Sequence, residues 1–319
     1  MKLEQVLVLG GSGFVGTSLA NRLADRGLRV RIPTRRRSRA GHLLPLPTVD
    51  VIEANIHDDA ALEGLLDGVD AVVNLVAVLH SPTGKPYGPE FAKVHVELPR
   101  RLVAACDKKR VRRLVHVSAL GAAADGPSEY LRSKAAGEAA IRAAGRKLGW
   151  TIVRPSVIFG PGDHFLNMFA GLLRFMPLLP IGGAKARMQP VYVEDVAELL
   201  ADCLAWPEAV GQTWEAAGPR VYTLEQLVEY AGEVSGHRGL VIPLPQAVAM
   251  FQAALMERLP NPPLSRDNLR SLQKDSVVEG EPLPFGATPT ALEAIAPLYL
   301  SPQRRRASFF GLAQRGREV

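Results

Sequence analysis

A tyrosine and a lysine in the segment YLRSK could together transfer a proton. Tyr130 and Lys134 are four residues apart, so they share one face if this segment is helical. A phenol has a pKa of about 10, and a neighbouring ammonium group lowers that pKa by favouring the phenolate. The pair therefore predicts general acid–base chemistry, with Tyr130 exchanging the proton and Lys134 supporting it. Because this spacing also arises by chance, its weight depends on where the fold places it.

A glycine cluster near the N-terminus predicts a site for a dinucleotide. In VLVLGGSGFVG, Gly10, Gly13 and Gly16 follow an apolar run at intervals of three, and Gly11 completes a G-x-G-x-x-G pattern. We expect Gly10 or Gly11 to form a sharp turn. Gly13 would let a diphosphate approach the main chain, and Gly16 would let the next helix pack on the sheet. The residues predicted to contact the phosphates are Gly10, Ser12, Gly13, Phe14 and Gly16.

The end of the second expected strand favours NADP(H) over NAD(H). An NAD site usually carries an acidic residue here, which binds the ribose hydroxyls. This chain has instead Thr34, Arg35, Arg36 and Arg37, with no carboxylate nearby in the sequence. Guanidinium groups suit a 2′-phosphate by charge and by geometry. The alternative interpretation is that these arginines only solvate a surface loop.

The elements that must position these residues alternate between strands and helices. Strands are expected at 6–9, 29–33, 49–53, 71–78, 114–118 and 151–155, and helices at 14–26, 60–66, 91–107 and 130–148. The strands lack polar alternation, which is typical of a parallel sheet covered on both faces. The sequence therefore predicts an α/β fold with a doubly wound parallel sheet, the Rossmann fold. Tyr130 and Lys134 would then follow the fifth strand, at the carboxyl edge where a nicotinamide binds.

The second half of the chain predicts a smaller, mostly helical C-terminal lobe. Beyond Gly160 the alternation of strands and helices breaks, and Pro and Gly become frequent. We expect a dinucleotide-binding domain at 1–160 and a substrate or partner lobe at 161–319, with residues 188–218 returning to the Rossmann core. The segment FLNMFAGLLRFMPLLP at 165–180 is strongly apolar. It forms either the core of this lobe or a surface for a quinone, a lipid, an isoprenoid-like substrate or a membrane.

Composition argues against several classes of protein. The chain has 319 residues, is 47% hydrophobic, and contains no uncharged apolar run long enough to span a membrane. Two distant cysteines fit a reducing compartment, and the absence of a secretory signal predicts a cytoplasmic protein. The seven histidines show no spacing for metal ligands, so we expect no metal. The basic residues lack the interleaved aromatics of a nucleic-acid surface, so we expect no nucleic-acid partner.

The net charge of +6 is concentrated in two places, the arginine segment described above and the tail at 301–319. The plain interpretation of the tail is a solvated surface. Together with Phe309 and Phe310, however, its arginines could bind a membrane surface. The chain would then be peripheral at the inner face of that membrane.

Several segments resemble the short-chain dehydrogenase/reductase superfamily, in its extended or atypical branch. They are the glycine cluster, NLVA at 74–77, the Tyr130/Lys134 pair, RPSVIFGPGD at 154–163 and VYVEDVA at 191–197. A narrower resemblance is to the nucleotide-binding accessory subunit of respiratory complex I and its bacterial relatives, an epimerase/dehydratase-like group. It lies in YLRSKAAGE, RPSVIFGPGDHFLNMF and FGATPTALEAIAPLYL, and thus extends nearly to the C-terminus.

This resemblance implies further contacts to the adenine, the ribose and the nicotinamide. They are Asn55 and Ile56 at the adenine, Ala77 and Val78 at the ribose, and Pro155, Ser156 and Val157 at the nicotinamide. The resemblance also implies that Asp195 is structural, and Lys134 can hold the nicotinamide ribose.

One departure from the family leaves two functions open. Active extended members carry a Ser or Thr after the fifth strand to hold the substrate carbonyl, but this place is Leu120 in VHVSALGAA. Ser118 is the only hydroxyl in that turn. If it reaches the carbonyl, Ser118, Tyr130 and Lys134 form the catalytic set of an NADP(H)-dependent oxidoreductase or epimerase acting on a carbonyl, sugar-nucleotide or apolar substrate. If it lies too deep, the chain is a nucleotide-holding accessory or assembly factor of a respiratory or quinone-handling system.

Overall fold

The computed structural model describes residues 3–259 and 262–301, and the chain divides into two compact units. The first unit comprises Met1–Pro155, Val193–Ala216 and Pro284–Gly286, and the second comprises Ser156–Tyr192, Ala217–Leu283 and Ala287–Val319. The chain thus leaves the first unit slightly before the expected boundary at 160, and it returns within the expected segment 188–218. Except for Ser301, the basic tail lies outside the described residues.

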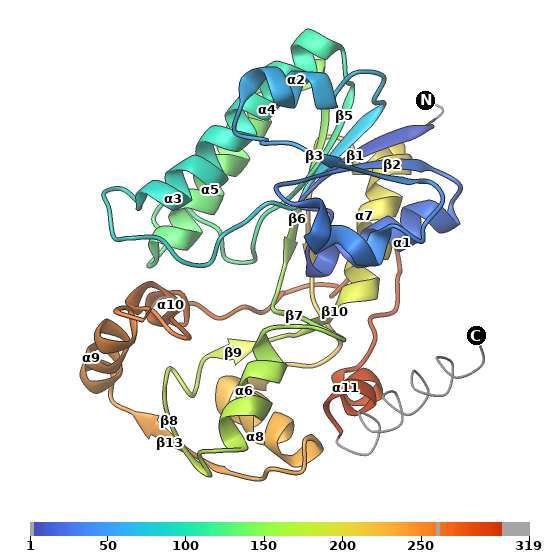
Figure 1. Ribbon diagram of the computed structural model, residues 1–319. Coiled ribbons are helices and arrows are strands. Elements are labelled where there is room, and N and C mark those ends of the chain that lie inside the picture. Colours follow the sequence, from blue (N-terminus) through green and yellow to red (C-terminus); the bar gives the residue numbers. More distant parts are fainter. Residues whose placement is uncertain (1–2, 260–261, 302–319) are drawn as a thin grey trace, which may run out of the picture. The chain divides into compact units, whose positions relative to one another are not determined.

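A seven-stranded sheet forms the centre of the first unit (Figure 1). Its strands are β1 (Gln5–Leu9), β2 (Arg29–Thr34), β3 (Val49–Glu53), β4 (Ala71–Asn74), β5 (Arg113–Val117), β6 (Gly149–Pro155) and β11 (Gln212–Ala216). The order is β11–β6–β5–β4–β1–β2–β3, and every neighbouring pair is parallel. The chain runs outward from β1 in one direction and from β4 in the other. This confirms the predicted doubly wound sheet.

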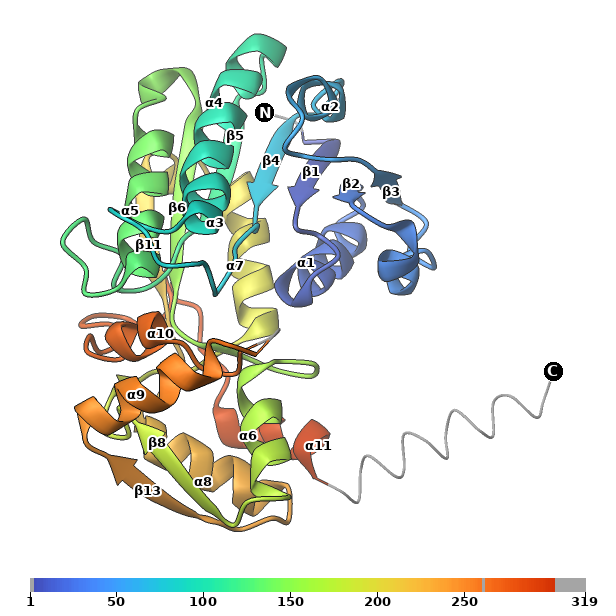
Figure 2. The same ribbon diagram turned by 60° about the vertical axis from the view of Figure 1, so that its left-hand side comes forward.

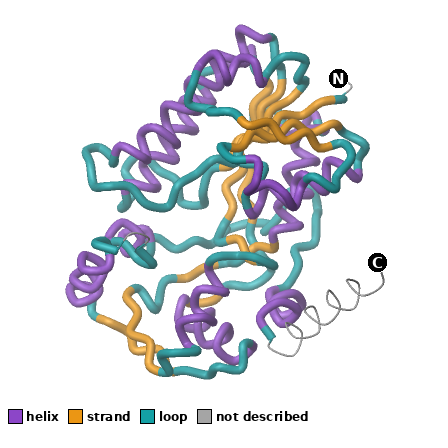
Figure 3. Tube along the Cα trace, viewed as in Figure 1, coloured by secondary structure: helices purple, strands orange, loops and turns teal. Residues whose placement is uncertain are grey.

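Helices cover both faces of this sheet (Figures 1 and 3). They are α1 (Phe14–Asp25), α2 (Asp59–Leu65), α3 (Pro89–Phe91), α4 (Leu98–Lys109), α5 (Glu129–Arg142) and α7 (Val193–Ala205), with short turns at Arg37–Leu43, Gly145–Lys147 and Pro207–Ala209. The pair α1 and α7 lies on one face, and α2, α4 and α5 lie on the other. The side chains of Val6–Leu9 are fully buried between these layers, which is why this strand is apolar throughout.

Three elements differ from the expectation. Strand β4 ends at Asn74 instead of residue 78, because the Asn74 side-chain oxygen accepts a hydrogen bond from the Val76 N–H and turns the chain. The helix expected at 91–107 contains a π-helical segment at Ala92–Glu97 between α3 and α4. The helix expected at 130–148 ends at Arg142, since the chain turns at Gly145 with a φ of +59°.

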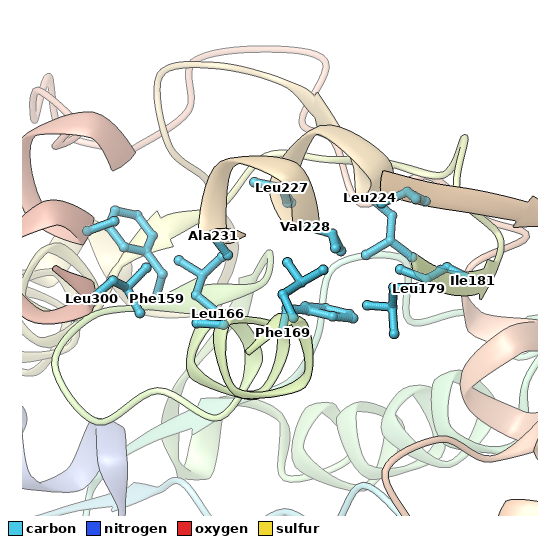
Figure 4. Close-up of a cluster of buried hydrophobic side chains, with 14 of the residues drawn as sticks. Phe159, Leu166, Phe169, Leu179, Ile181, Leu224, Leu227, Val228, Ala231 and Leu300 are labelled. Atoms are coloured by element: carbon cyan, nitrogen blue, oxygen red, sulfur yellow. The ribbon is translucent and has the colours of Figure 1, made fainter. Parts of the chain in front are cut away.

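The second unit packs short strands and helices around its own apolar cluster (Figure 4). Its helices are α6 (Phe165–Leu173), α8 (Leu224–Val234), α9 (Gln246–Met256), α10 (Arg266–Ser271) and α11 (Leu292–Leu300). Its strands form three pairs: β7 (Ile158–Phe159) with β10 (Val191–Tyr192), β9 (Arg187–Met188) with β12 (Tyr222–Thr223), and β8 (Leu178–Gly182) with β13 (Leu240–Leu244). Phe159, Leu166, Phe169 and Leu227 are among the buried side chains of the cluster.

The apolar segment at 165–180 contributes both to this core and to the surface. Leu166, Phe169 and Leu173 of α6 are buried in the cluster, as the core interpretation expects. Phe175 and Met176, which follow the helix, are instead exposed. Among the described helices, none combines the length and the apolar character needed to cross a membrane.

The contact between the first turn and α1 yields a prediction about stability. A Cβ atom added at Gly16 would lie 2.4 Å from the Gly10 carbonyl oxygen and 2.5 Å from the Gly11 Cα. Because both neighbours are main chain, we expect Gly16→Ala to lower the free energy of unfolding by about 1–3 kcal/mol. Denaturant unfolding measures this loss.

Gly64→Ala is the matched control. Gly64 is also helical, in α2, but an added Cβ would meet no atom within 4 Å. We expect this substitution to raise the free energy of unfolding by up to about 1 kcal/mol, because alanine favours a helix over glycine. Equal unfolding curves for the two variants would show that the close contact at Gly16 is not real.

Candidate functional site

The first turn has the geometry that a phosphate-binding loop requires. Gly10 has a φ of +81°, a conformation that favours glycine, so of the two residues expected to turn the chain it is Gly10 that adopts it. The Gly11 N–H donates to the Val8 oxygen at 3.2 Å, and the Gly13 N–H donates to the Gly10 oxygen at 3.0 Å. These two bonds fold the loop back on the end of β1 and hold it compact.

The loop leads directly into the N-terminus of α1. Gly13 is the residue before the helix, and with no side chain it cannot cap the first N–H groups. An added Cβ there would lie 3.3 Å from the Gly10 oxygen, which is tighter than usual. The first N–H groups of a helix have no acceptor within the helix, so those of Phe14 and its neighbours can face a diphosphate. Ser12, in the same loop, is partly buried.

After β2, the structure exposes the arginine side chains to solvent, where they could contact an anion. It also places near them a carboxylate that the sequence did not lead us to expect. The side chains of Arg35, Arg36 and Arg37 are exposed. Thr34 is 8% exposed, and its hydroxyl accepts from the Arg36 N–H at 3.4 Å and donates to the Arg36 oxygen at 3.2 Å. No carboxylate is nearby in the sequence, but the fold brings one close, because Glu53 at the end of β3 accepts a hydrogen bond from the Arg37 N–H at 3.2 Å. Parallel pairing of β2 and β3 brings this residue close.

The residues implied at the adenine and ribose follow β3 and β4. Asn55 turns the chain after β3, since its side-chain oxygen accepts from the His57 N–H at 3.1 Å. Ile56 packs against the apolar cluster beneath the sheet. Ala77 is exposed after β4, and the Val78 N–H is already engaged by a side chain described below.

Tyr130 and Lys134 share the first turns of α5, which Ser128 caps by accepting from the Leu131 N–H at 3.1 Å. Lys134 is 2% exposed, and its Nζ donates to the Val117 oxygen at the end of β5, at 2.8 Å. Burial lowers the pKa of Lys134 to about 8, although Glu138 acts in the opposite direction. Burial also raises the pKa of Tyr130 to about 12. The expected lowering of the phenol pKa by Lys134 is therefore not found.

The hydroxyl of Ser118 lies at a buried carboxylate. The Glu138 side chain is fully buried, and its two oxygens accept from Arg154 Nε at 2.7 Å and from the Arg154 terminal nitrogen at 2.6 Å. Burial alone would raise the pKa of Glu138, but the interactions with Arg154 and with the Ser118 hydroxyl lower it. Ser118 is 4% exposed, and its Oγ is buried with no hydrogen-bond partner among the described residues. Leu120 is 8% exposed, and its N–H donates to the Pro155 oxygen at 2.9 Å.

His95 is a residue of the site that the sequence analysis did not identify. Its Nε2 accepts from the Val78 N–H at 3.1 Å, and its Nδ1 lies 2.8 Å from Ser133 Oγ. Because Ser133 Oγ donates to the main-chain carbonyl oxygen of Tyr130 at 2.7 Å, Nδ1 carries the proton and His95 is neutral. Burial, with the charge of Lys134, lowers the pKa of His95 to about 2. His95 thus links the loop after β4 to α5, the helix of Tyr130. The only sign of this role in the sequence was its place among the apolar residues of an expected helix.

The residues implied at the nicotinamide fall on both sides of the boundary between the units. Pro155 ends β6 in the first unit. In the second unit, Ser156 Oγ donates to the Ser276 oxygen at 2.9 Å, and the Val157 oxygen accepts from the Val191 N–H at 2.9 Å. Asp195, implied to be structural, lies in the first turn of α7.

Within the first unit, the sheet brings most of these residues to one edge. The glycine turn follows β1, the arginines follow β2, Asn55 follows β3, Val78 follows β4, and Tyr130 follows β5. These five strands are parallel neighbours, so their carboxyl ends meet at the same edge. This edge, at the point where the strand order reverses, is where open α/β sheets bind ligands. The arrangement can hold a dinucleotide along the ends of the strands.

Comparison with known proteins agrees with this geometry. Residues 6–217 match the model of the NAD dependent epimerase/dehydratase family. The chain is 32% identical over 300 residues to NADH dehydrogenase (ubiquinone) 1 alpha subcomplex subunit 9, mitochondrial, of Mus musculus, which covers 90% of this chain and 77% of that protein. It is 29% identical over 253 residues to the ceramide reductase of Caulobacter vibrioides, covering 79% of this chain and 77% of that protein.

Solved structures share the fold at lower identity. The structure of MoeE5 in complex with UDP-glucose and NAD superposes with a TM-score of 0.71 at 20% identity, covering 96% of this chain and 99% of that chain. At this identity the likeness establishes the fold alone. The two proteins thus share the overall fold.

The buried lysine yields a prediction for the pH dependence of stability. Between pH 8 and 10 the unfolded chain keeps the Lys134 proton, whereas the folded chain, with a Lys134 pKa of about 8, loses it. Stability therefore rises with pH in this window. Relative to Lys134→Met, we expect the wild-type free energy of unfolding to increase by roughly 1.4 kcal/mol per pH unit. Denaturant unfolding at a series of pH values measures the difference.

Lys147→Met serves as the control, because Lys147 is exposed. Its difference from the wild type should stay constant over the same pH range. A constant difference for Lys134→Met as well would contradict the burial of a charged ammonium group at this position.

Proposed function

Because the chain belongs to the NAD dependent epimerase/dehydratase family, we propose that it holds a dinucleotide as an accessory or assembly protein of a respiratory or quinone-handling complex. The observation that carries this proposal is the burial of Ser118, which is 4% exposed and supplies the only hydroxyl of the turn after β5. Similarity to the mitochondrial alpha subcomplex subunit 9 along 90% of the chain supports the respiratory setting. The chain would act in the cytoplasm, at the inner face of the membrane that carries the complex.

The nucleotide in this proposal is NADP(H). Three arginine side chains after β2 are exposed, and the one carboxylate described beside them, that of Glu53, accepts a hydrogen bond from the main chain. The Thr34 hydroxyl is likewise engaged by the main chain of Arg36. Guanidinium groups would therefore be the side chains that meet the adenosine ribose, and they bind a phosphate better than a diol.

Replacing two of these arginines tests the choice of nucleotide. We expect Arg35→Gln with Arg36→Gln to weaken NADPH binding about ten- to hundredfold, because charge-assisted hydrogen bonds to the 2′-phosphate are lost. NADH binding should change little. Isothermal titration calorimetry measures both affinities, and Arg39→Gln, an exposed arginine of the following turn, is the control. Tighter binding of NADH than of NADPH by the wild type would refute the preference.

A second function, reduction of an apolar carbonyl substrate, is favoured by one comparison. The chain is similar to a ceramide reductase along 79% of its length, and the Tyr130/Lys134 pair is intact. In that case Tyr130 would supply the proton and Lys134 would hold the ribose. The raised pKa of Tyr130 and the burial of Ser118 favour the accessory role instead.

Comparison of the wild type with Tyr130→Phe separates these two functions. Purified protein is mixed with NADPH and a panel of apolar ketones and sugar nucleotides, and oxidation is followed by absorbance. If the chain only holds the nucleotide, both proteins should oxidise NADPH at the same background rate. A wild-type rate more than about a hundredfold above that of Tyr130→Phe, with equal nucleotide affinity, would establish an enzyme. Identifying the nucleotide released on denaturation shows which form co-purifies.

A further inference from the structure

The strand pair β8 and β13 exposes one apolar face. Leu178 pairs with Leu240, and Pro180 pairs with Ile242, so these side chains lie on the same side of the two-stranded sheet. Leu178, Leu240 and Ile242 are exposed, whereas Val241, on the opposite side, is buried. The core of the second unit covers the inner side of the strand pair. On the outer side, the pairs Leu178–Leu240 and Pro180–Ile242 have no comparable cover.

Helix α9 crosses the far end of the same face. An added Cβ at Gly182, which is on the outer side of β8, would lie 2.4 Å from the Ala249 Cβ, so the helix packs closely there. Both views of the ribbon draw α9 beside these strands (Figures 1 and 2). The opposite side of α9 faces away from the strands. There Val248, Phe251 and Leu255 are exposed, and Phe251 is 74% exposed. Spacings of three and four residues place these three on one side of the helix.

We call the exposed apolar side chains of these neighbouring elements the α9 surface. It comprises Phe175, Leu178, Leu240, Ile242, Phe251 and Leu255, and Phe175 is 79% exposed. From Gln246 to Met256 the helix contains no charged residue. Soluble proteins rarely expose so many large apolar side chains together unless the surface binds something.

The charge that remains at the α9 surface is positive. The Arg174 guanidinium carbon lies 5.5 Å from the centre of the Phe175 ring, and Arg258 is exposed directly after α9. Within the described part of the chain, no ion pair involves either arginine. Two carboxylates of neighbouring elements form ion pairs with arginines. Glu233 pairs with Arg238 at 2.6 Å, and Glu257 pairs with an arginine of α10 at 2.9 Å.

We propose that the α9 surface docks on an anionic lipid bilayer. Phe251, Leu255 and Phe175 would enter the interface between headgroups and acyl chains, and Arg174 and Arg258 would meet the phosphates. A protein partner would need hydrogen bonds about every 100–200 Å², and these side chains offer none. A twofold contact with a second copy would bring the same unpaired arginines together. The proposal does not depend on nucleotide binding.

Co-sedimentation of the full chain with vesicles tests this proposal. Vesicles of phosphatidylcholine containing phosphatidylglycerol should bind the wild type, and added salt or pure phosphatidylcholine should weaken the binding. We expect Phe251→Asp with Leu255→Asp to reduce the partition coefficient at least about tenfold, because two apolar side chains no longer enter the bilayer. Arg174→Gln and Arg258→Gln should each reduce it about fivefold, and only on the anionic vesicles.

The matched control is Leu44→Asp with Val210→Asp, which places the same charges at exposed apolar positions of the first unit. This variant should bind vesicles nearly as the wild type does, and all variants keep the basic tail. Nucleotide affinity and thermal unfolding, measured alongside, show that each variant is folded.

Three outcomes would overturn the proposal. The wild type could fail to bind the anionic vesicles, or the control could lose as much binding as the α9 variant. The α9 variant could also abolish a dimer in analytical ultracentrifugation while vesicle binding persists, which would make the surface a contact between copies. None of these outcomes bears on whether the first unit holds NADP(H).

Discussion

A single buried carboxylate determines how the helix of the candidate site lies on the sheet. The Glu138 side chain is fully enclosed, and it stays ionised because Arg154 donates two hydrogen bonds to it and Arg142 forms an ion pair at 3.0 Å. Removing either partner from a buried charge costs several kcal/mol, so α5 cannot slide or rotate on β6 without a large loss of stability. The register of α5 is therefore fixed, and with it the face that carries Tyr130 and Lys134.

The same carboxylate also acts on Lys134, one turn before it on α5. It favours the charged form of Lys134, whose pKa burial would otherwise lower further, and so keeps a cation where a ribose hydroxyl needs a donor. Ser118, the only hydroxyl of the turn after β5, is buried, and its Oγ has no hydrogen-bond partner within the described part of the chain. One buried charge thus supports the cation of Lys134, while the hydroxyl that the chemistry of Tyr130 would require stays enclosed.

Most of the fold could be predicted because its signals are local. Apolar runs mark the central strands, and the glycine spacing marks the turn where Gly10 adopts a positive φ. Strand β11 was missed because QTWEA is an edge strand with polar residues and no buried run. His95 and Glu53 were missed for another reason. The partners of His95 are 17 and 38 residues away, and the partner of Glu53 is 16 residues away, so only the folded sheet brings each group together.

Nucleotide binding and chemistry depend on different parts of this site, so a chain can keep one and lose the other. In the proposed function, binding would use main-chain N–H groups of the first turn and arginines on the surface, and it would need no shifted pKa. Proton transfer needs a phenol near its working pKa and a hydroxyl on the substrate side. Here burial raises the pKa of Tyr130 to about 12. His95, which lies between the loop after β4 and α5, is neutral, so it carries no charge that would lower that pKa. His95 therefore ties the loop after β4 to α5, and this fixed geometry is what the proposed role, to hold a nucleotide without consuming it, would require.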